Sequence, residues 1–323
     1  NIKPDYDLSL MKPNQNLYNL TAEVIAGLKP ILESFKADFV YVHGDTTTTF
    51  AVSLACFYNK IRVAHVEAGL RTFDLYSPWP EEFNRQITSK ITKYHFAPTL
   101  KSKENLINEN VPDELISVTG NTIIDTLHLG LDIIKHKKLD LIIKNKFKFN
   151  FKNKIVLITA HRRENFGQGF EHICNALSII AKKYPDVHIV YPVHLNPNVQ
   201  EPVKRILSNL KNVHLIEPLD YLLFIKIMDV SYLILTDSGG IQEEAPSLAK
   251  PVLVMRNNTE RPEALDAGTI KLVGTNTEDV IRGTSDLLEN KNNIYQIMSK
   301  SHNPFGNGDS SKKIRKILEE ANI

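Results

Sequence analysis

One stretch of the sequence passes from an apolar run into a helix without a spacer: Tyr232-Leu233-Ile234-Leu235-Thr236-Asp237-Ser238-Gly239-Gly240-Ile241-Gln242-Glu243-Glu244-Ala245. Its apolar start is typical of a strand that is buried on both faces of a parallel sheet. Glycines at the junction let an anion approach the backbone, where the first N–H groups and the helix dipole favour negative charge. We therefore expect Ser238, Gly239 and Gly240 to bind a phosphate group; the alternative is an ordinary tight turn.

Two charged residues near this junction extend the expected site. Glu244 lies one turn into the helix, where an acidic side chain can accept hydrogen bonds from ribose hydroxyls. Arg261 follows the next apolar run, 252–255, and its guanidinium can oppose a phosphate charge. The presence of Glu244 and Arg261 near the glycine junction favours a nucleotide-binding site over an ordinary tight turn.

Short apolar runs alternate with amphipathic stretches along almost the whole chain. The runs that predict strands are 39–42, 63–66, 94–97 and 116–119, followed by 155–159, 188–191, 213–216, 232–235, 252–255 and 270–273. Strands that alternate with helices predict α/β domains, each with a parallel sheet covered on both faces. The second series is a complete doubly wound domain, whereas the first has about four strands where such sheets usually have about five or six.

The alternation breaks between Lys135 and Lys154, a stretch rich in Lys, Asn and Phe. We interpret it as the end of a helix and a link, and we predict a domain boundary near residue 150. The predicted domains are therefore 1–150 and 151–305. Because the first series of strands is short and the chain starts with Asn1 instead of Met, we expect the first domain to lack its beginning.

Length and composition narrow the class of protein. The 323 residues fit two α/β domains. With 39 basic and 37 acidic side chains, a net charge of +2 gives no reason to expect nucleic acid or a membrane surface as partner. No apolar run approaches the ~20 residues of a membrane helix, and the N-terminus does not have the features of a signal peptide. The isolated Cys56 and Cys174 favour a reducing compartment, so we expect a cytoplasmic protein.

Carboxylates follow the expected strands of the first domain, at the edge where open parallel sheets bind ligands. Asp45 comes after the first strand, where the alternative role is a helix N-cap. Glu67 leaves the second strand beside a glycine, where the alternative is a buried ion pair with Arg71. Glu81 and Glu82 open a helix behind a stiff loop, and helix-start acids are common. Of these two, Glu81 is the candidate for the site.

Basic residues and histidines follow the strands of the second domain. His161, Arg162 and Arg163 come after the strand 155–159, where they can meet an anionic ligand; an exposed charge cluster is the alternative. His194 lies in a further polar loop at a strand end, and by itself it is weak evidence.

The sequence gives little support to a metal site. His43 and Asp45, and likewise His65 and Glu67, are spaced so that both side chains lie on one face of a strand. No further histidine completes a ligand set at diagnostic spacing. We therefore expect no metal, and there is no G-x-G-x-x-G, Walker A or G-x-S-x-G motif.

Taken in order, the motifs resemble those of the non-hydrolysing UDP-N-acetylglucosamine 2-epimerases across nearly the whole chain. The matching strings are His43-Gly44-Asp45-Thr46-Thr47-Thr48, His65-Val66-Glu67-Ala68-Gly69-Leu70-Arg71, Ser77-Pro78-Trp79-Pro80-Glu81-Glu82, Gly120-Asn121-Thr122, His161-Arg162-Arg163-Glu164, Pro192-Val193-His194-Leu195-Asn196-Pro197 and Asp237-Ser238-Gly239-Gly240-Ile241-Gln242-Glu243-Glu244. One departure is the missing first strand with its Gly-Thr-Arg-Pro-Glu loop, which faces the substrate in the family.

The resemblance implies a GT-B type fold, two Rossmann-like domains with the active site in the cleft between them. The last segment, 306–323, would then be a helix that crosses back to the first domain. The implied enzyme is an isomerase that interconverts UDP-GlcNAc and UDP-ManNAc, by eliminating UDP to 2-acetamidoglucal and adding it back, and supplies ManNAc for cell-surface polysaccharide. No metal or nicotinamide cofactor is implied.

The resemblance also assigns roles to residues. Asp45, Glu67 and Glu81 match the acid–base carboxylates, and His161 matches a further active-site position. The positions that hold UDP match Ser238, Gly239, Gly240, Glu244 and Arg261. A homodimer is expected, and Arg162, Arg163 and His194 are the expected contacts of an activating second UDP-GlcNAc.

The sequence leaves three other functions open. A hydrolysing relative would release free N-acetylmannosamine and UDP from UDP-GlcNAc. A GT-B glycosyltransferase would need an acceptor. An inactive UDP-sugar-binding fragment would bind the nucleotide without turning over.

Overall fold

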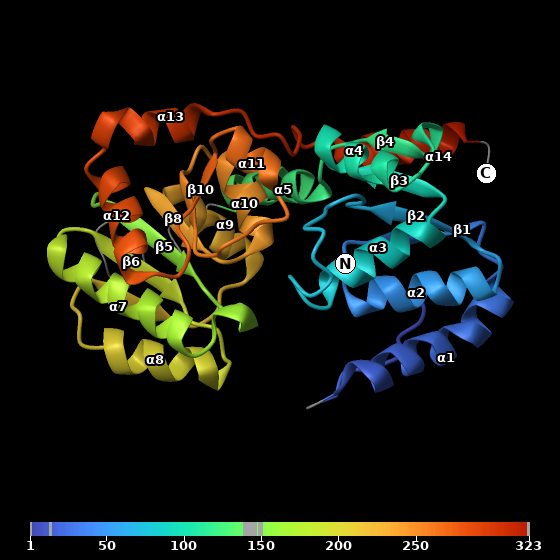
Figure 1. Ribbon diagram of the computed structural model, residues 1–323, viewed down its shortest axis with the longest axis horizontal. Helices are drawn as coiled ribbons and strands as arrows, with labels where there is room; N and C mark the ends of the chain where they lie inside the picture. Colours follow the sequence, from blue (N-terminus) through green and yellow to red (C-terminus); the bar gives the residue numbers. More distant parts are fainter. Residues whose placement is uncertain (1, 13–14, 138–146, 148–150, 322–323) are drawn as a thin grey trace. The chain divides into compact units, whose positions relative to one another are not determined.

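The computed structural model describes residues 2–12, 15–137, 147 and 151–321. The chain divides into two compact α/β units (Figure 1). Unit 1 comprises Asn1–Thr122 together with Asp309–Ile323, and unit 2 comprises Ile123–Gly308.

Unit 1 contains a four-stranded parallel sheet in the order β1-β2-β3-β4. Its strands are β1 Phe39–His43, β2 Arg62–Val66, β3 Tyr94–Ala97 and β4 Ile116–Val118. In the register of the ladder, Val40 lies opposite Val63, and Ala64 lies opposite Tyr94. Because all four strands run the same way, the loops that follow them share one edge of the sheet.

The helices of unit 1 begin at side-chain caps in several cases. They are α1 Leu17–Phe35, α2 Thr47–Tyr58, α3 Glu81–Ile91, α4 Leu100–Asn108 and α14 Ser310–Glu320, with a 3₁₀ turn η1 at Asp113–Leu115. The oxygens of Asn16, Thr46 and Thr99 accept backbone N–H groups at the starts of α1, α2 and α4. Such caps satisfy donors that have no partner within the helix.

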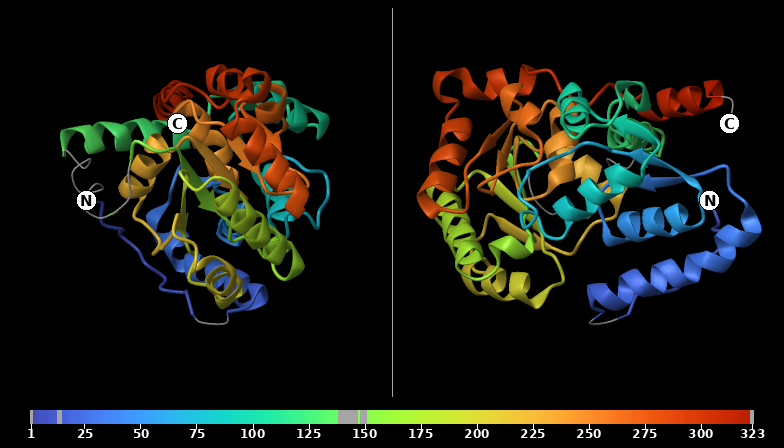
Figure 2. Two further views of the ribbon diagram at one scale, coloured as in Figure 1. Left: turned by 90° about the vertical axis from the view of Figure 1, so that its left-hand side faces the viewer. Right: turned by 45° about the vertical axis from the view of Figure 1, so that its right-hand side comes forward.

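Helices cover both faces of this sheet because successive strand residues point to opposite sides. Val63 packs with α1 and α2 on one face, where Leu32 and Cys56 are buried. Ala64 faces the other side and packs against Ile314 of α14. Helices α1 and α2 lie side by side in Figure 2.

Unit 2 contains a six-stranded parallel sheet in the order β10-β9-β8-β5-β6-β7. Its strands are β5 Ile155–Thr159, β6 His188–Pro192, β7 Val213–Ile216, β8 Leu233–Thr236, β9 Val252–Val254 and β10 Ile270–Leu272. This is the strand order of a dinucleotide-binding doubly wound sheet, whose direction of winding reverses between β5 and β8. The loops after these two strands therefore flank the switch point, where such folds bind ligands.

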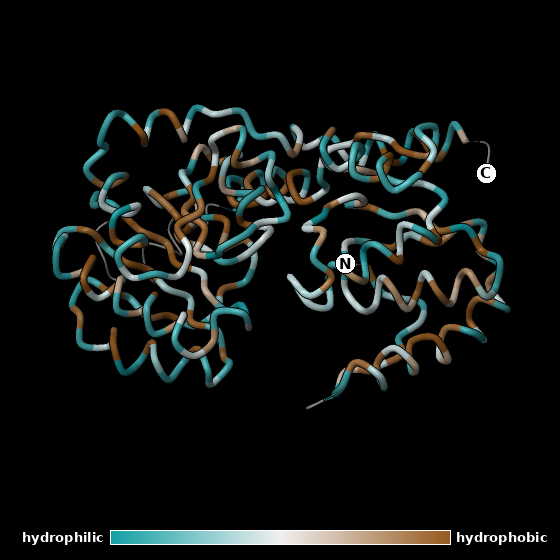
Figure 3. The backbone as a smooth tube through the Cα atoms, in the orientation of Figure 1, coloured by the Kyte–Doolittle hydropathy of each residue, from teal (hydrophilic) through white to brown (hydrophobic). Residues whose placement is uncertain are grey.

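The helices of unit 2 form a layer on each face of the sheet. They are α5 Thr122–His136, α7 Gln168–Lys183, α8 Pro197–Leu207, α9 Tyr221–Val230, α10 Gly239–Ser247, α11 Pro262–Asp266, α12 Thr277–Leu288 and α13 Ile294–Lys300, with 3₁₀ turns η2 Arg163–Asn165 and η3 Lys291–Asn293. Helices α7, α8 and α12 pack on one face and α5, α9, α10 and α11 on the other. In Figure 3 the hydrophobic stretches of unit 2 gather on its central strands.

The expected strands are confirmed to within about a residue at each end, and so is the α/β class with two parallel sheets. The units divide at Thr122–Ile123, whereas the sequence placed a boundary near residue 150. The reason is that α5 buries Ile124 and Leu127 in the core of unit 2. Residues 138–146 and 148–150, where we expected the link, lie outside the described residues.

Helix α14 belongs to unit 1, where Ile314 and Leu318 are buried beside Phe96 of β3. Among the described residues, no helix is long and apolar enough to cross a membrane.

Candidate active site

In unit 1, the loop after β1 orients Asp45. Gly44 has a positive φ of 69° and so turns the chain at the end of the strand. Thr46 is the N-cap of α2, because its Oγ1 accepts the N–H of Thr49 at 3.4 Å. The cap role that the sequence left open for Asp45 therefore belongs to Thr46.

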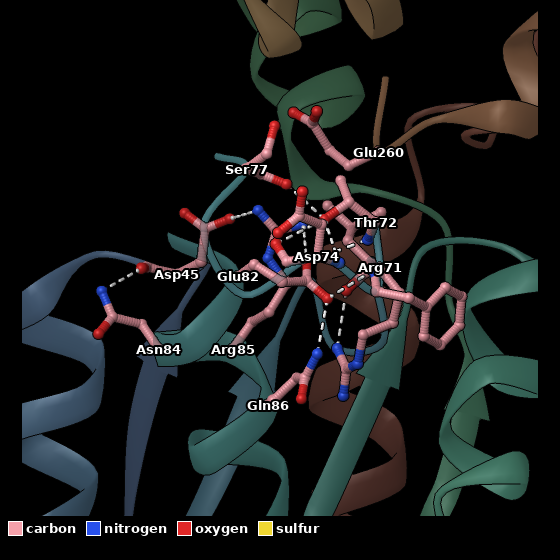
Figure 4. Close-up of polar contacts among 12 residues, drawn as sticks. Asp45, Arg71, Thr72, Asp74, Ser77, Glu82, Asn84, Arg85, Gln86 and Glu260 are labelled. Atoms are coloured by element: carbon pink, nitrogen blue, oxygen red, sulfur yellow. Dashed lines mark hydrogen bonds and ion pairs between the residues drawn. The ribbon is translucent and has the colours of Figure 1, made fainter. Parts of the chain in front are cut away.

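Asp45 forms an ion pair with a buried arginine. The Arg85 Nη2 atom lies 2.7 Å from Asp45 Oδ2, and Arg85 Nη1 lies 3.3 Å from Glu82 Oε2. The side chain of Asn84 donates to the backbone oxygen of Asp45 at 2.9 Å. Figure 4 shows Arg85 between the two carboxylates. The pairing holds Asp45 in one place, while a quarter of its side chain stays exposed.

The two adjacent acids at the start of α3 have different surroundings. Glu82 is fully buried and accepts the backbone N–H groups of Thr72 and Phe73, both at 3.0 Å (Figure 4). It therefore fixes the loop that precedes α3. Glu81 is partly exposed, and its side chain makes no hydrogen bond or ion pair within the described ranges. Of this pair, Glu81 is the acid that is available to a ligand.

Glu67 follows β2 in a left-handed conformation with φ of 66°. Its Oε2 accepts a hydrogen bond from Asn121 Nδ2 at 2.8 Å and lies 3.9 Å from His43 Nε2. The alternative ion pair with Arg71 is not formed, because Arg71 Nε binds Glu109 Oε1 at 2.6 Å. A non-glycine residue with positive φ is strained, and such residues cluster at functional sites.

In unit 2, a buried carboxylate joins the loops on both sides of the switch point. Asp237 follows β8, and its Oδ2 accepts the backbone N–H groups of His161 and Arg162 after β5, both at 2.8 Å. Asn165 Nδ2 donates to the same oxygen at 3.2 Å. The Asp237 side chain is fully buried, so it ties the loop 161–165 to the end of β8.

His161 lies between Asp237 and a second histidine. Its Nδ1 is 3.7 Å from Asp237 Oδ1, and its ring stacks on that of His194 with centroids 5.5 Å apart. Partial desolvation lowers the pKa of His161, the Asp237 charge opposes this shift, and His194 and Arg162 add to it. The side chain of Arg163 lies outside the described residues.

The two glycines that begin α10 have different surroundings. A Cβ atom added at Gly240 would find nothing within 4 Å apart from its chain neighbours and the backbone of its own helix, so the space beside it is open. A Cβ added at Gly239 would lie 2.6 Å from Arg261 Nη1. Ser238 is the N-cap residue, and its N–H donates to Thr236 Oγ1 at 2.9 Å. Open space at a helix N-terminus is what an anionic ligand requires.

Arg261 is held behind this turn by two buried carboxylates. Its Nε donates to Glu243 Oε1 at 2.5 Å, and its Nη1 donates to Glu260 Oε1. Arg256 binds the other oxygen of Glu260 at 3.0 Å and reaches Glu164 at 2.8 Å. Arg261 is thus paired with two carboxylates beside Gly239, and its predicted contact with UDP stays a prediction.

Glu244 differs from the buried carboxylates above because its hydrogen-bond donor, Tyr221, is a neutral side chain. Tyr221 donates its phenol O–H to Glu244 Oε1 at 2.5 Å. Desolvation raises the pKa of Glu244 to about 7, and the tyrosine hydrogen bond lowers it only in part. Sequence reasoning missed Tyr221, Arg85, Asn121 and Asp237, although Asn121 and Asp237 stood inside the matching strings.

A cavity of about 210 Å³ opens at the switch point of unit 2. It is lined by Thr159, Ala160, His161, Pro192, His194, Pro218, Leu219, Phe224, Ser238 and Ile241. The structure thus brings His161, His194 and Ser238 of the sequence-based candidates to one cavity. Its walls are mostly apolar with a few convergent polar groups, as in small-molecule sites. In the part of the chain that the structure describes, no three His, Cys, Asp or Glu side chains form a metal-binding set.

These features define a class of protein: a two-unit α/β enzyme of the nucleotide-sugar type, with a glycine turn at a doubly wound switch point and carboxylates at the edge of a second parallel sheet. The family model for UDP-N-acetylglucosamine 2-epimerase matches residues 1–319. The chain therefore belongs to the UDP-N-acetylglucosamine 2-epimerase family.

Individual relatives agree with this assignment. A UDP-N-acetylglucosamine 2-epimerase of Salmonella typhimurium is 56% identical over 100% of this chain and 86% of its own length. The crystal structure of UDP-GlcNAc 2-epimerase from Neisseria meningitidis bound to UDP-GlcNAc has a TM-score of 0.96 at 52% identity, covering 99% of this chain and 86% of that one. A Methanocaldococcus jannaschii UDP-GlcNAc 2-epimerase in complex with UDP-GlcNAc and UDP has a TM-score of 0.86 at 35% identity, covering 99% and 85%. The fold is of the GT-B type, and the chain is an epimerase.

Proposed function

We propose that this epimerase interconverts UDP-GlcNAc and UDP-ManNAc by eliminating UDP and adding it back. The single observation that carries the proposal is the open space beside Gly240, at the N-terminus of α10 and the switch point of unit 2. Two solved relatives support it, one bound to UDP-GlcNAc and the other in complex with UDP-GlcNAc and UDP. In this proposal the N–H groups at the start of α10 bind the diphosphate, and Glu244 accepts the ribose hydroxyls.

The chemistry explains the carboxylates of unit 1. Loss of the C2 proton and departure of UDP from C1 give 2-acetamidoglucal, and the return of UDP to C1 with a proton on the other face of C2 gives the epimer. No adjacent carbonyl acidifies C2–H, so a base and stabilisation of the leaving group must act together. Asp45, Glu67 and Glu81 would supply the proton-transfer groups, and His161 would stabilise the diphosphate that leaves.

The compartment and the role of the product are part of the proposal. Cys56 and Cys174 are buried free thiols, which supports a reducing compartment and hence the cytoplasm. The product would supply ManNAc for cell-surface polysaccharide. The expected homodimer is also part of the proposal, and light scattering on a size-exclusion column would measure the association of two copies.

One experiment in deuterium oxide tests the reaction. The enzyme is incubated with UDP-GlcNAc, and the products are separated and analysed by NMR and mass spectrometry. We expect UDP-ManNAc with deuterium at C2, because the C2–H bond breaks. Free N-acetylmannosamine with UDP would identify a hydrolysing enzyme, turnover only with an acceptor would identify a glycosyltransferase, and product without deuterium would overturn the elimination.

A further inference from the structure

The Asp237 carboxylate has one oxygen that the loop contacts do not explain. Oδ2 accepts three donors, the N–H groups of His161 and Arg162 and the side chain of Asn165. Oδ1 is equally buried, and among the described residues it has no hydrogen-bond partner. A buried acceptor without a donor costs free energy, so a purely structural tie at Oδ2 does not account for the whole side chain.

The unsatisfied oxygen faces the ring of His161. Asp237 Oδ1 and His161 Nδ1 are 3.7 Å apart, beyond hydrogen-bond length but within the range of a small ring movement. The His161 ring can make this movement because its side chain is 42% exposed, whereas Asp237 is locked by three hydrogen bonds. The fixed partner is therefore the carboxylate, and the moving partner is the imidazole.

We propose that Asp237 is a positioning residue for His161. Asp237 Oδ1 accepts a hydrogen bond from His161 Nδ1–H, and this bond turns Nε2 of the ring toward the cavity. The inference rests on the proposed role of His161 in the reaction. A histidine whose Nδ1–H is held by a carboxylate keeps one tautomer and one orientation, and its protonated form is stabilised. His161 can then donate from Nε2 to the oxygen atoms of the departing diphosphate.

The charges around His161 explain why such a partner is needed. His194, stacked on the ring, and Arg162 on its own loop both disfavour a positive charge on His161. The rest of the cavity wall near the ring is uncharged, with Pro192, Leu219 and Ser238 among its residues. Asp237 is the group whose charge favours the imidazolium.

Asp237→Asn is the informative change because it preserves size and shape. The amide oxygen can still accept the N–H groups of His161 and Arg162, while the NH₂ group then faces Nδ1 as a donor. That arrangement reverses the tautomer and removes the negative charge. We expect kcat to fall by about 10²–10⁴-fold, with UDP affinity changed less than about threefold. The limb of the kcat–pH profile that reports His161 should move to lower pH, since a lost negative neighbour lowers a histidine pKa.

The decisive readout needs no turnover. Protein with isotope-labelled histidine is titrated by NMR, and the His161 signal is assigned by its loss in His161→Gln. A lower His161 midpoint in Asp237→Asn supports the proposal, even if the chain proved to have another activity. An unchanged midpoint in a folded variant overturns it and leaves Asp237 as a loop tie only.

Two further measurements separate positioning from stability. Asn165→Ala removes one donor to Oδ2 but leaves Oδ1 facing the ring, so it should lower the melting temperature without moving the His161 midpoint; an equal movement in both variants would overturn the proposal. If Asp237→Asn does not fold, the ¹⁵N chemical shifts of His161 in the unmodified protein show which ring nitrogen carries the proton. A proton on Nδ1 of neutral His161 supports the inference, and a proton on Nε2 overturns it.

Discussion

The candidate proton-transfer carboxylates of unit 1 differ in burial from two carboxylates that brace the nucleotide end of unit 2. Asp45 and Glu67 keep 25% and 17% of their side chains exposed. In unit 2, Asp237 and Glu243 are fully buried and bind backbone N–H groups or a guanidinium. A group that exchanges protons needs access to its ligand, whereas a group that fixes a loop is buried among its hydrogen-bond donors. The comparison therefore fits the proposal that unit 1 supplies the proton-transfer groups and unit 2 the nucleotide site.

The largest effect tests the proton-transfer side of this comparison. Asp45→Asn, Glu67→Gln and Glu81→Gln should each lower kcat by about 10²–10⁴-fold, the usual contribution of a general acid or base. UDP affinity, measured by calorimetry, should change little. Glu104→Gln, an exposed acid of the same unit, is the matched control and should keep full activity. Near-normal turnover by all three amides would contradict the assignment.

The next effect tests the binding side through two adjacent glycines. Gly240→Leu fills open space and should weaken UDP binding by at least about 100-fold, roughly the loss of one or two charge-assisted hydrogen bonds, with the melting temperature nearly unchanged. Gly239→Ala places a methyl group against Arg261 and should cost about 1–3 kcal/mol of stability. Calorimetry measures the UDP affinity of both variants, and thermal unfolding measures their stability. Unchanged UDP affinity in Gly240→Leu would remove the main support for the nucleotide site.

A third prediction concerns Arg85, the cation that holds Asp45. Arg85→Met leaves Glu82 buried without its cation, so unfolding in denaturant should show a loss of about 3–5 kcal/mol. Lys101→Met breaks an exposed pair with Glu104 and should cost less than about 1 kcal/mol. Equal losses in the two variants would show that burial does not distinguish these pairs.

Glu244 sharpens the comparison because it is buried beside a neutral donor. Its pKa is raised to about 7. At pH values between the ordinary carboxyl pKa and about 7, the folded state therefore keeps a proton on Glu244 that the unfolded state has released. The stability it contributes is full below the ordinary carboxyl pKa and is lost as pH rises through about 7. Between pH 5 and pH 8 we expect the native chain to lose roughly 1–3 kcal/mol relative to Glu244→Gln. Parallel pH dependence in the two proteins would refute the raised pKa.

The smallest expected effect is that of chelation. Because the candidate ligands do not complete a set at diagnostic spacing, epimerase activity should be unchanged after dialysis against EDTA. The check is a rate assay before and after chelation. Loss of activity that one divalent ion restores would show that the His-x-acid pairs of unit 1 bind metal.

The sequence predicted the strands because each is a short apolar run whose burial follows from its own residues. It could not predict the partner of Arg71, which is Glu109, the residue that follows α4 and lies 38 positions away, instead of the nearby Glu67. The same holds for Asp45 and Arg85, whose pairing depends on how α3 packs against the loop after β1. Periodicity describes single elements, whereas charge pairing is decided by contacts between elements.

The candidate site shows the same difference between features of single elements and contacts between elements. The glycine turn was predictable because it is a local junction of strand and helix. Asp237 was visible in the sequence, but its role depends on backbone donors of a loop 75 and 76 residues earlier in the chain. The boundary near residue 150 differs from the observed division because only tertiary packing shows that α5 joins the core of unit 2.

Helix α14 has a consequence for biosynthesis. Ile314 and Leu318 complete a core of unit 1 whose other members lie before residue 97, and the whole of Ile123–Gly308 is translated between them. At about 5–20 residues per second, the ribosome needs on the order of ten to forty seconds for that insertion. During this interval Ala64 and Phe96 of the first sheet lack the α14 side chains that pack on them in the finished fold. Unit 2 can therefore finish folding first, and the window in which a chaperone is useful belongs to the N-terminal part of the chain.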